Sequence, residues 1–268
     1  MSTSSAGPGA AQPGRPDSAA YERTARRRVE TALFMRDHVL SLVSHDLRGP
    51  LNAIHSWAYV LERKLDAADS AGQRALGGIR TGVEQQVKLL EEIVDTTRAE
   101  TRTLALDHAP FALWPLVDET LGEVRTTLAG PREVSIEVDT QLSTDQLSGD
   151  RDRLSAALWL MLTFAVEASA AASQVTLATA VDGTAWHSTV TFHPTPAAFD
   201  AADAPHLLEA FARRQAQAPC EAGRIAWVLA LCRRVAEAHG GTFEQNDAAQ
   251  SGGAATLALR VPLAGAGA

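Results

Sequence analysis

A histidine followed by an aspartate lies inside a long amphipathic segment, at His45 and Asp46. A neutral imidazole nitrogen accepts a phosphoryl group near neutral pH. A carboxylate beside it can hold the ring in one tautomer or take its proton. The pair therefore combines a nucleophilic nitrogen with a neighbouring base.

Helix periodicity places His45 on the solvent side of this segment. At about 100° per residue, six apolar residues lie between roughly 160° and 240° from His45, in alternating spacings of four and three. Such spacing is typical of the seam of a packed helical bundle. The six residues are Leu47, Leu51, Ile54, Ala58, Leu61 and Leu65. Because a histidine that packs in a core would lie on the seam, His45 is predicted to be presented to another molecule.

Four further residues surround the histidine. Ser41, Arg48 and Asn52 lie within about 60° of it on the same helix face. We expect them to contact phosphoryl oxygens or a docking partner. Gly49 has no side chain, and so leaves room beside His45 for the close approach of that partner.

The composition narrows the function classes. A chain of 268 residues, 46% of them hydrophobic, forms one large or two modest domains with a real core. A formal net charge of −8 without a basic stripe argues against nucleic-acid binding. No apolar run approaches the ~18 residues that cross a bilayer, so we expect a cytoplasmic protein without membrane contact. Cys220 and Cys232 are expected to be reduced thiols without a metal.

The chain divides into three parts. Residues 1–20, rich in Ser, Gly, Pro and Ala, are predicted to be a disordered leader. Residues 21–104 are predicted to form a hairpin of two helices, at about 19–66 and 73–101. One hairpin buries little on its far side, so two chains are expected to pair as a homodimeric four-helix bundle. Residues 105–268 are predicted to be an α/β sandwich, with helices on one face of a sheet, which makes the whole chain α+β.

Alternating and helical patterns locate the elements of the third part. Gly240 and Gly241 are expected to end its last helix. Strands are predicted at 111–113, 134–138, 175–180, 186–192, 242–245 and 255–261, and helices at 114–128, 150–169 and 224–239.

The segment from Ser44 to Ile54 reads Ser-His-Asp-Leu-Arg-Gly-Pro-Leu-Asn-Ala-Ile, and Phe34-Met35-Arg36-Asp37-His38 precedes it. Both resemble the phosphoacceptor box of bacterial two-component sensor histidine kinases. The resemblance implies that His45 takes the γ-phosphoryl group of ATP and passes it to an aspartate of a response regulator receiver domain.

The third part is similar to the Bergerat-type ATPase domain of the same family. The similarity implies that Asp150 leads into the helix that carries the family's asparagines, and that Phe211 belongs to a phenylalanine box. The matching segments are 149–154, 206–211 and 231–241.

The residues that would bind nucleotide depart from the family pattern. Leu160 and Phe164 stand where the family places two asparagines for Mg²⁺ and phosphate, and neither offers the oxygen that Mg²⁺ needs. Glu167 replaces a basic residue and would repel phosphate. The adenine-reading motif corresponds to residues 192–198, which have no aspartate or glycine. The second glycine box is reduced to residues 225–228, so we expect the chain to have no nucleotide or metal cofactor of its own.

Three functions remain open. The leading hypothesis is a relay, in which His45 carries phosphoryl groups between receiver aspartates and the receiver supplies Mg²⁺. The second is a sensor histidine kinase that autophosphorylates His45 with ATP at a divergent site. The third is a non-catalytic scaffold that binds response regulators. Phosphatase activity is not expected, because related kinases place a water-orienting Thr or Asn where this chain has Gly49.

Overall fold

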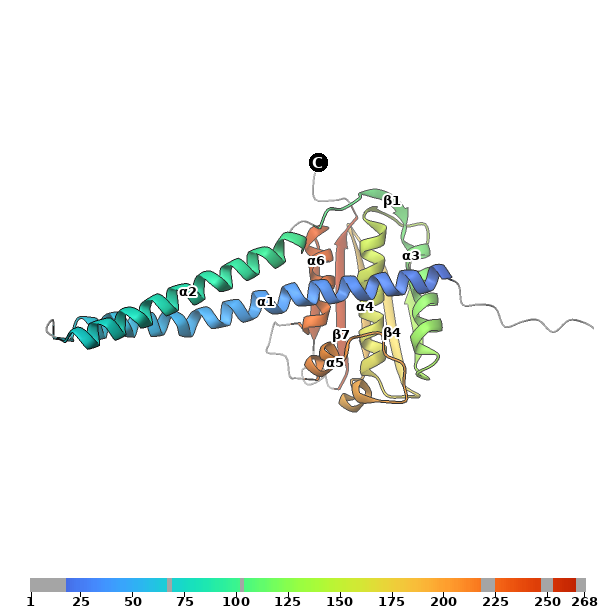
Figure 1. Cartoon of the computed structure of the whole chain (residues 1–268). Coiled ribbons are helices and arrows are strands. Elements are labelled where there is room, and N and C mark those ends of the chain that lie inside the picture. Colours follow the sequence, from blue (N-terminus) through green and yellow to red (C-terminus); the bar gives the residue numbers. More distant parts are fainter. Residues whose placement is uncertain (1–17, 67–68, 102–103, 218–224, 247–252, 264–268) are drawn as a thin grey trace, which may run out of the picture.

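A computed structural model of the chain consists of a long helical hairpin and an α/β body (Figure 1). Cys220 and most of the predicted leader lie outside the residues that the structure describes. The described residues are 18–66, 69–101, 104–217, 225–246 and 253–263.

The hairpin consists of α1 (Ser18–Glu62) and α2 (Ser70–Thr101), which lie side by side as predicted (Figure 1). Helix α1 begins at Ser18, inside the segment predicted to be the leader. It continues through Pro50, since a proline inside a helix removes only one backbone donor. No helix in the described part of the chain is long and apolar enough to cross a membrane.

The body contains two sheets. In the smaller one, β1 (Ala109–Ala112) pairs antiparallel with β3 (Gln146–Gly149). Strand β3 was not predicted, because its sequence Gln-Leu-Ser-Gly contains a single apolar residue. The larger sheet has the strand order β2-β4-β5-β7-β6, in which only the β2–β4 pair is parallel. Its strands are β2 (Ser135–Thr140), β4 (Gln174–Asp182), β5 (Ala185–Phe192), β6 (Thr242–Asn246) and β7 (Ala255–Pro262).

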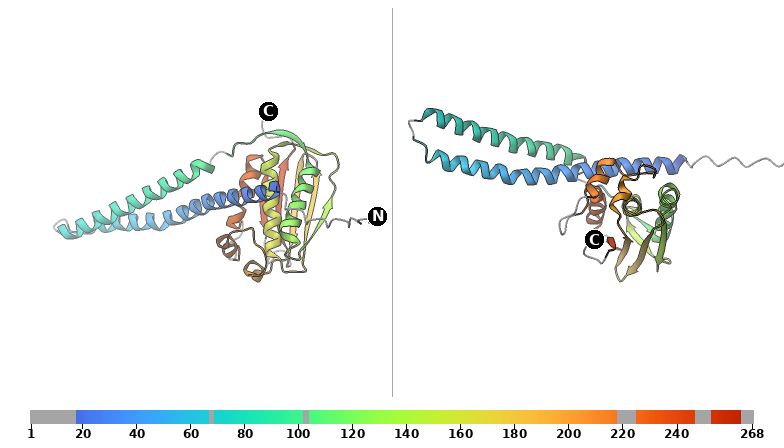
Figure 2. Two further views of the ribbon diagram at one scale, coloured as in Figure 1. Left: turned by 45° about the vertical axis from the view of Figure 1, so that its right-hand side comes forward. Right: turned by 90° about the horizontal axis from the view of Figure 1, so that it is seen from below.

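Three helices cover one face of the larger sheet, as predicted (Figures 1 and 2). Helix α4 is central in this layer, and every residue from Leu154 to Ala168 is buried. The first half of α1 lies across the outer side of the layer, where Phe34 and Met35 join the core of the body. The hairpin and the body therefore share one hydrophobic core. The three helices are α3 (Leu113–Val124), which continues as a π-helical turn over Arg125–Ala129, α4 (Arg151–Ala168) and α6 (Ala230–Ala238).

The predicted helix at 224–239 was wrong at its start. A 3₁₀ turn covers Trp227–Leu229, and α6 begins only at Ala230. The backbone N–H of Ala226 donates to Gln245 Oε1 at 2.8 Å, which holds this part of the chain in a non-helical conformation. The helix ends as predicted, with Gly240 at a φ of 71°. The short helix α5 (Ala210–Ala216) and the 3₁₀ turn Pro196–Asp200 were not predicted.

Candidate phosphoacceptor site

The side chain of His45 is 82% exposed and lies near the middle of α1. Its Nδ1 lies 3.3 Å from Asp46 Oδ1, so the carboxylate contacts the ring from the next residue along the chain. The pair can accept a group at the other ring nitrogen while Asp46 holds Nδ1.

The residues predicted to flank the histidine lie on the surface around it. Arg48 Nη2 is 3.7 Å from Glu91 Oε1 of α2, which ties this arginine to the second helix. The Asn52 side chain is exposed and Ser41 is half-buried. A Cβ added at Gly49 would meet no heavy atom within 4 Å, so the surface beside His45 is open.

The predicted seam on α1 is only partly covered by α2. Ala58 is 3% exposed, whereas Leu47, Ile54 and Leu61 are 44%, 47% and 49% exposed. These three side chains form an apolar row that a single hairpin leaves open to water.

The residues that correspond to the family's nucleotide motifs pack against one another. The ring of Phe164 lies 5.7 Å from that of Phe199 and 6.1 Å from that of Phe192, measured between centroids. All three rings are buried, and Leu160 is a fully buried member of the same hydrophobic core. Trp227, from the reduced second glycine box, lies 6.1 Å from the ring of Phe211. These side chains supply no oxygen ligand for a cation.

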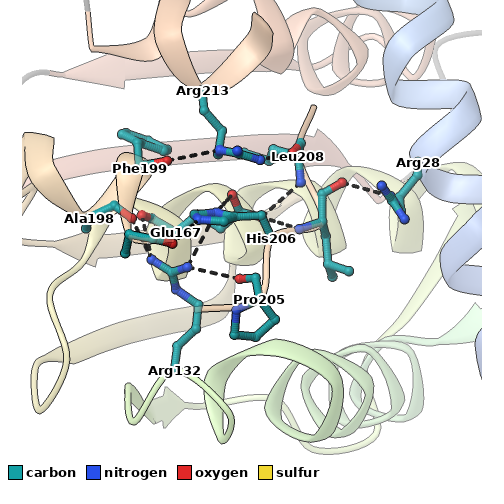
Figure 3. A network of polar contacts seen from close by, with 11 residues as sticks. Arg28, Arg132, Glu167, Ala198, Phe199, Pro205, His206, Leu208 and Arg213 are labelled. Carbon is teal, nitrogen blue, oxygen red and sulfur yellow. Dashed lines mark hydrogen bonds and ion pairs between the residues drawn. The ribbon is translucent and has the colours of Figure 1, made fainter. Parts of the chain in front are cut away.

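Glu167 holds a neighbouring segment of the chain (Figure 3). Its Oε1 accepts hydrogen bonds from the backbone N–H groups of Leu207 and Leu208 at 2.6 and 2.9 Å. Its Oε2 lies 2.9 Å from His206 Nδ1. Because the carboxylate is fully buried, it must be satisfied inside the protein, and these contacts satisfy it.

Arg132 completes this cluster from the turn before β2 (Figure 3). Its Nη2 donates to the carbonyl oxygens of Glu167 and Ala198 at 3.2 and 2.9 Å. Burial lowers the pKa of Arg132 below its ordinary value, and Glu167 opposes that shift. Arg132 was not predicted to belong to a site, and His206 was predicted only as part of the segment 206–211, not as a partner of Glu167. The available signal was a glutamate deep inside an apolar helix, which requires buried partners.

A second buried histidine, His239, lies at the end of α6. Its Nδ1 donates to the Val235 carbonyl at 2.8 Å, and its Nε2 accepts from the Asp150 N–H at 3.0 Å. A ring that donates at one nitrogen and accepts at the other is neutral. Burial lowers the pKa of His239 below its ordinary value of 6.5, and the nearby His108 adds to this effect.

His239 is therefore expected to make folding pH-dependent. Below about pH 6.5 the imidazole of His239 binds a proton in the unfolded chain, whereas the buried ring of the folded chain stays neutral. Protonation therefore favours the unfolded state, and the free energy of unfolding decreases as the pH falls from about 6.5 toward the folded pKa. His239→Gln keeps one donor and one acceptor, and should reduce the loss of stability between about pH 7.5 and about pH 5.5. Urea denaturation of both proteins at the two pH values measures this difference in the free energy of unfolding. The exposed His45→Gln variant is the control and should behave as the wild type.

Comparisons with known proteins agree with this fold and identify a phosphoacceptor domain in its first part. Residues 35–102 match the model of the His Kinase A (phospho-acceptor) domain. The crystal structure of a histidine kinase from Burkholderia phymatum STM815 is 57% identical, covers 91% of this chain and 99% of its own, and superposes with a TM-score of 0.76.

Two longer sensor proteins are also similar. The sensor protein GacS of Pseudomonas syringae pv. syringae is 24% identical over 246 residues, which is 90% of this chain and 26% of GacS. The autoinducer 2 sensor kinase/phosphatase LuxQ of Vibrio vulnificus YJ016 is 26% identical over 152 residues, 56% of this chain and 17% of LuxQ. The chain thus spans about a quarter or less of these curated relatives.

A presented histidine on a helical hairpin, joined to an ATPase-like α/β body, defines the core of a two-component signalling protein. The chain belongs to the histidine kinase family and carries its phosphoacceptor domain.

Proposed function

We propose that this protein is a phosphorelay component, in which His45 receives a phosphoryl group from one receiver domain and passes it to another without ATP. The packing of Phe164 against Phe192 and Phe199 carries this proposal. Two of these buried rings, Phe164 and Phe192, lie in segments that would contact Mg-ATP, and Phe199 directly follows the second of them, while the phosphoacceptor remains exposed on α1.

The residues on α1 suit this transfer. The Nε2 of His45 attacks the phosphorus of an aspartyl phosphate, the N–P bond forms, and the acyl phosphate P–O bond breaks to release the receiver's carboxylate. Asp46 holds the proton on Nδ1 and stabilises the charge that develops on the ring. Arg48, Ser41 and Asn52 lie where they would contact phosphoryl oxygens or the receiver surface. Mg²⁺ held by the receiver would offset the negative charge on the oxygens of the transferred phosphoryl group.

A phosphorylated receiver domain tests the proposal. Incubation with the full-length protein should move labelled phosphate onto His45, and a second receiver should then remove it. Parallel incubation with labelled Mg-ATP should leave the protein unlabelled. Labelling by Mg-ATP together with no transfer from any receiver would exclude the relay.

A second candidate is an autophosphorylating kinase, favoured by the relatives. The structure that is 57% identical is described as a histidine kinase, and LuxQ is named a sensor kinase/phosphatase. In that case Mg-ATP would label His45 directly and raise the melting temperature of the protein.

The protein is proposed to bind receivers as a homodimer. The exposed apolar row on α1, formed by Leu47, Ile54 and Leu61, would be covered by the hairpin of a second copy. Ile54→Glu places a charge in this row and should convert the dimer into a monomer. Light scattering after size-exclusion chromatography measures the mass. Ser56→Glu, two residues away and exposed on the His45 face, is the control and should stay dimeric. A dimeric Ile54→Glu variant would show that the row is not the interface.

A further inference from the structure

The crossing of α1 over the body leaves a cavity between α1, α3 and α4. It has a volume of about 890 Å³. Pockets that hold small organic molecules have volumes of about 300–1,000 Å³ and mostly apolar walls with a few placed polar groups. The cavity lies near the N-terminal end of α1, distant from His45 along the same helix.

A fixed polar cluster forms part of the cavity wall. The Arg27 side chain is 13% exposed, and its Nη1 donates to Glu123 Oε2 at 2.7 Å. Its Nη2 donates to Ser155 Oγ at 2.6 Å, and Thr24 Oγ1 donates to Glu123 Oε1 at 2.7 Å. Because these bonds join all three helices, the wall is already ordered before a ligand arrives.

Exposed side chains of α1 complete the lining. Tyr21 is 75% exposed, and the side chain of Arg23 is 54% exposed with Nε 3.9 Å from Glu123 Oε2. Arg28 donates to the neutral Leu207 carbonyl at 2.9 Å, so its charge is not cancelled by that bond. The lining contains four arginines and three carboxylates, in a chain whose formal net charge is −8. The lining therefore carries a formal excess of one positive charge on a protein that is acidic as a whole.

We propose that this cavity binds a small amphipathic organic anion, with an aromatic or aliphatic body against the side chains of Tyr21, Ala25 and Leu207 and one anionic group near Arg23 and Arg28. Such a ligand would contact α1 on one side and α3 and α4 on the other, and so would favour the arrangement in which α1 lies on the body. Arg27 and His45 are 18 residues apart on one helix, about 27 Å along its axis. The site goes beyond the relay function, because it gives the protein an input of its own.

A cavity-filling variant tests the location. Gly122 lines the cavity, and a Cβ added there meets no heavy atom within 4 Å, so Gly122→Leu can project into the space without displacing the wall. The full-length protein is titrated with the fluorescent probe anilinonaphthalene sulfonate. Gly122→Leu should bind it at least about tenfold more weakly. The variant should melt no lower than the wild type, because leucine is a better helix former than glycine.

Gly77→Leu is the matched control, since Gly77 is an exposed helical glycine of α2 with open space around it. It should bind the probe as the wild type does. If Gly122→Leu binds the probe as tightly as the wild type, the probe lies elsewhere and the proposed site is wrong.

A charge comparison tests the ligand class. Arg23→Gln should weaken binding of the sulfonate probe about threefold to tenfold and leave binding of the uncharged N-phenylnaphthylamine unchanged. Equal loss for both probes, or loss for neither, would overturn the assignment of an anion. Arg214→Gln, on α5 and outside the cavity lining, is the control and should change neither.

Discussion

Replacing His45 by glutamine is expected to reduce phosphoryl transfer from a phosphorylated receiver to background. Glutamine keeps the size and polarity of the side chain but offers no nitrogen lone pair that can form the N–P bond. Transfer of labelled phosphate, followed by gel electrophoresis under conditions that preserve phosphohistidine, measures the effect. Asp46→Asn should retain acceptance but slow it about 100-fold, because the carboxylate no longer assists the ring.

The matched control is His55→Gln. His55 lies ten residues further along α1, and its Nε2 is 3.7 Å from Glu84 Oε1 of α2. This variant should accept phosphate as the wild type does. Undiminished labelling of the His45→Gln protein would contradict the assignment of the phosphoacceptor.

Replacing Glu167 by alanine is expected to destabilise the body by about 3–5 kcal/mol, the range seen when one partner of a buried ion pair is removed. The change leaves the N–H groups of Leu207 and Leu208 without their acceptor and removes the carboxylate that contacts His206. It also removes the negative charge that favours the charged form of Arg132, although the bond from Arg132 to the backbone carbonyl of residue 167 remains. Urea denaturation at pH near neutral measures it. Glu167→Gln keeps an oxygen for the two N–H groups, so its loss should be smaller.

Glu119→Ala is the control, since it removes an exposed carboxylate instead of the buried one. Glu119 is 67% exposed and pairs with Arg151, and its removal should cost at most about 1 kcal/mol. An equally small cost for Glu167→Ala would show that the buried cluster does not hold the 206–208 segment in place.

Much of the fold was predictable because its long elements carry strong periodicity. The apolar rows of α1 and α2 identified the hairpin, and the alternation in β4, β5 and β7 identified the sheet. The short elements β3 and α5 were missed, since four or seven residues hold too little pattern to separate them from a loop. The start of α6 depends on a hydrogen bond from Ala226 to Gln245, 19 residues away, which no local pattern reports.

In the candidate site, too, features that follow from local periodicity were predictable and features that depend on distant contacts were not. His45 was identified because exposure can be calculated from the helix angle alone, and its side chain is exposed. The role of Glu167 was not predicted, because its partners Arg132 and His206 are 35 and 39 residues away. This glutamate was predicted to repel phosphate, and in the structure its carboxylate accepts from three donors of the chain itself. The cavity between α1, α3 and α4 also depends on tertiary placement, since α1 must first lie across the body.

Calorimetric titration of the full-length protein with Mg-ATP tests the central claim most directly, because it asks whether the packed aromatic segments leave room for a nucleotide. An active histidine kinase titrated in parallel provides the positive control. We predict no saturable heat up to millimolar Mg-ATP, and no rise in the melting temperature. Saturable binding with one site per chain and a Kd below about 1 mM, worth more than about 4 kcal/mol, would contradict the account and favour an autophosphorylating kinase.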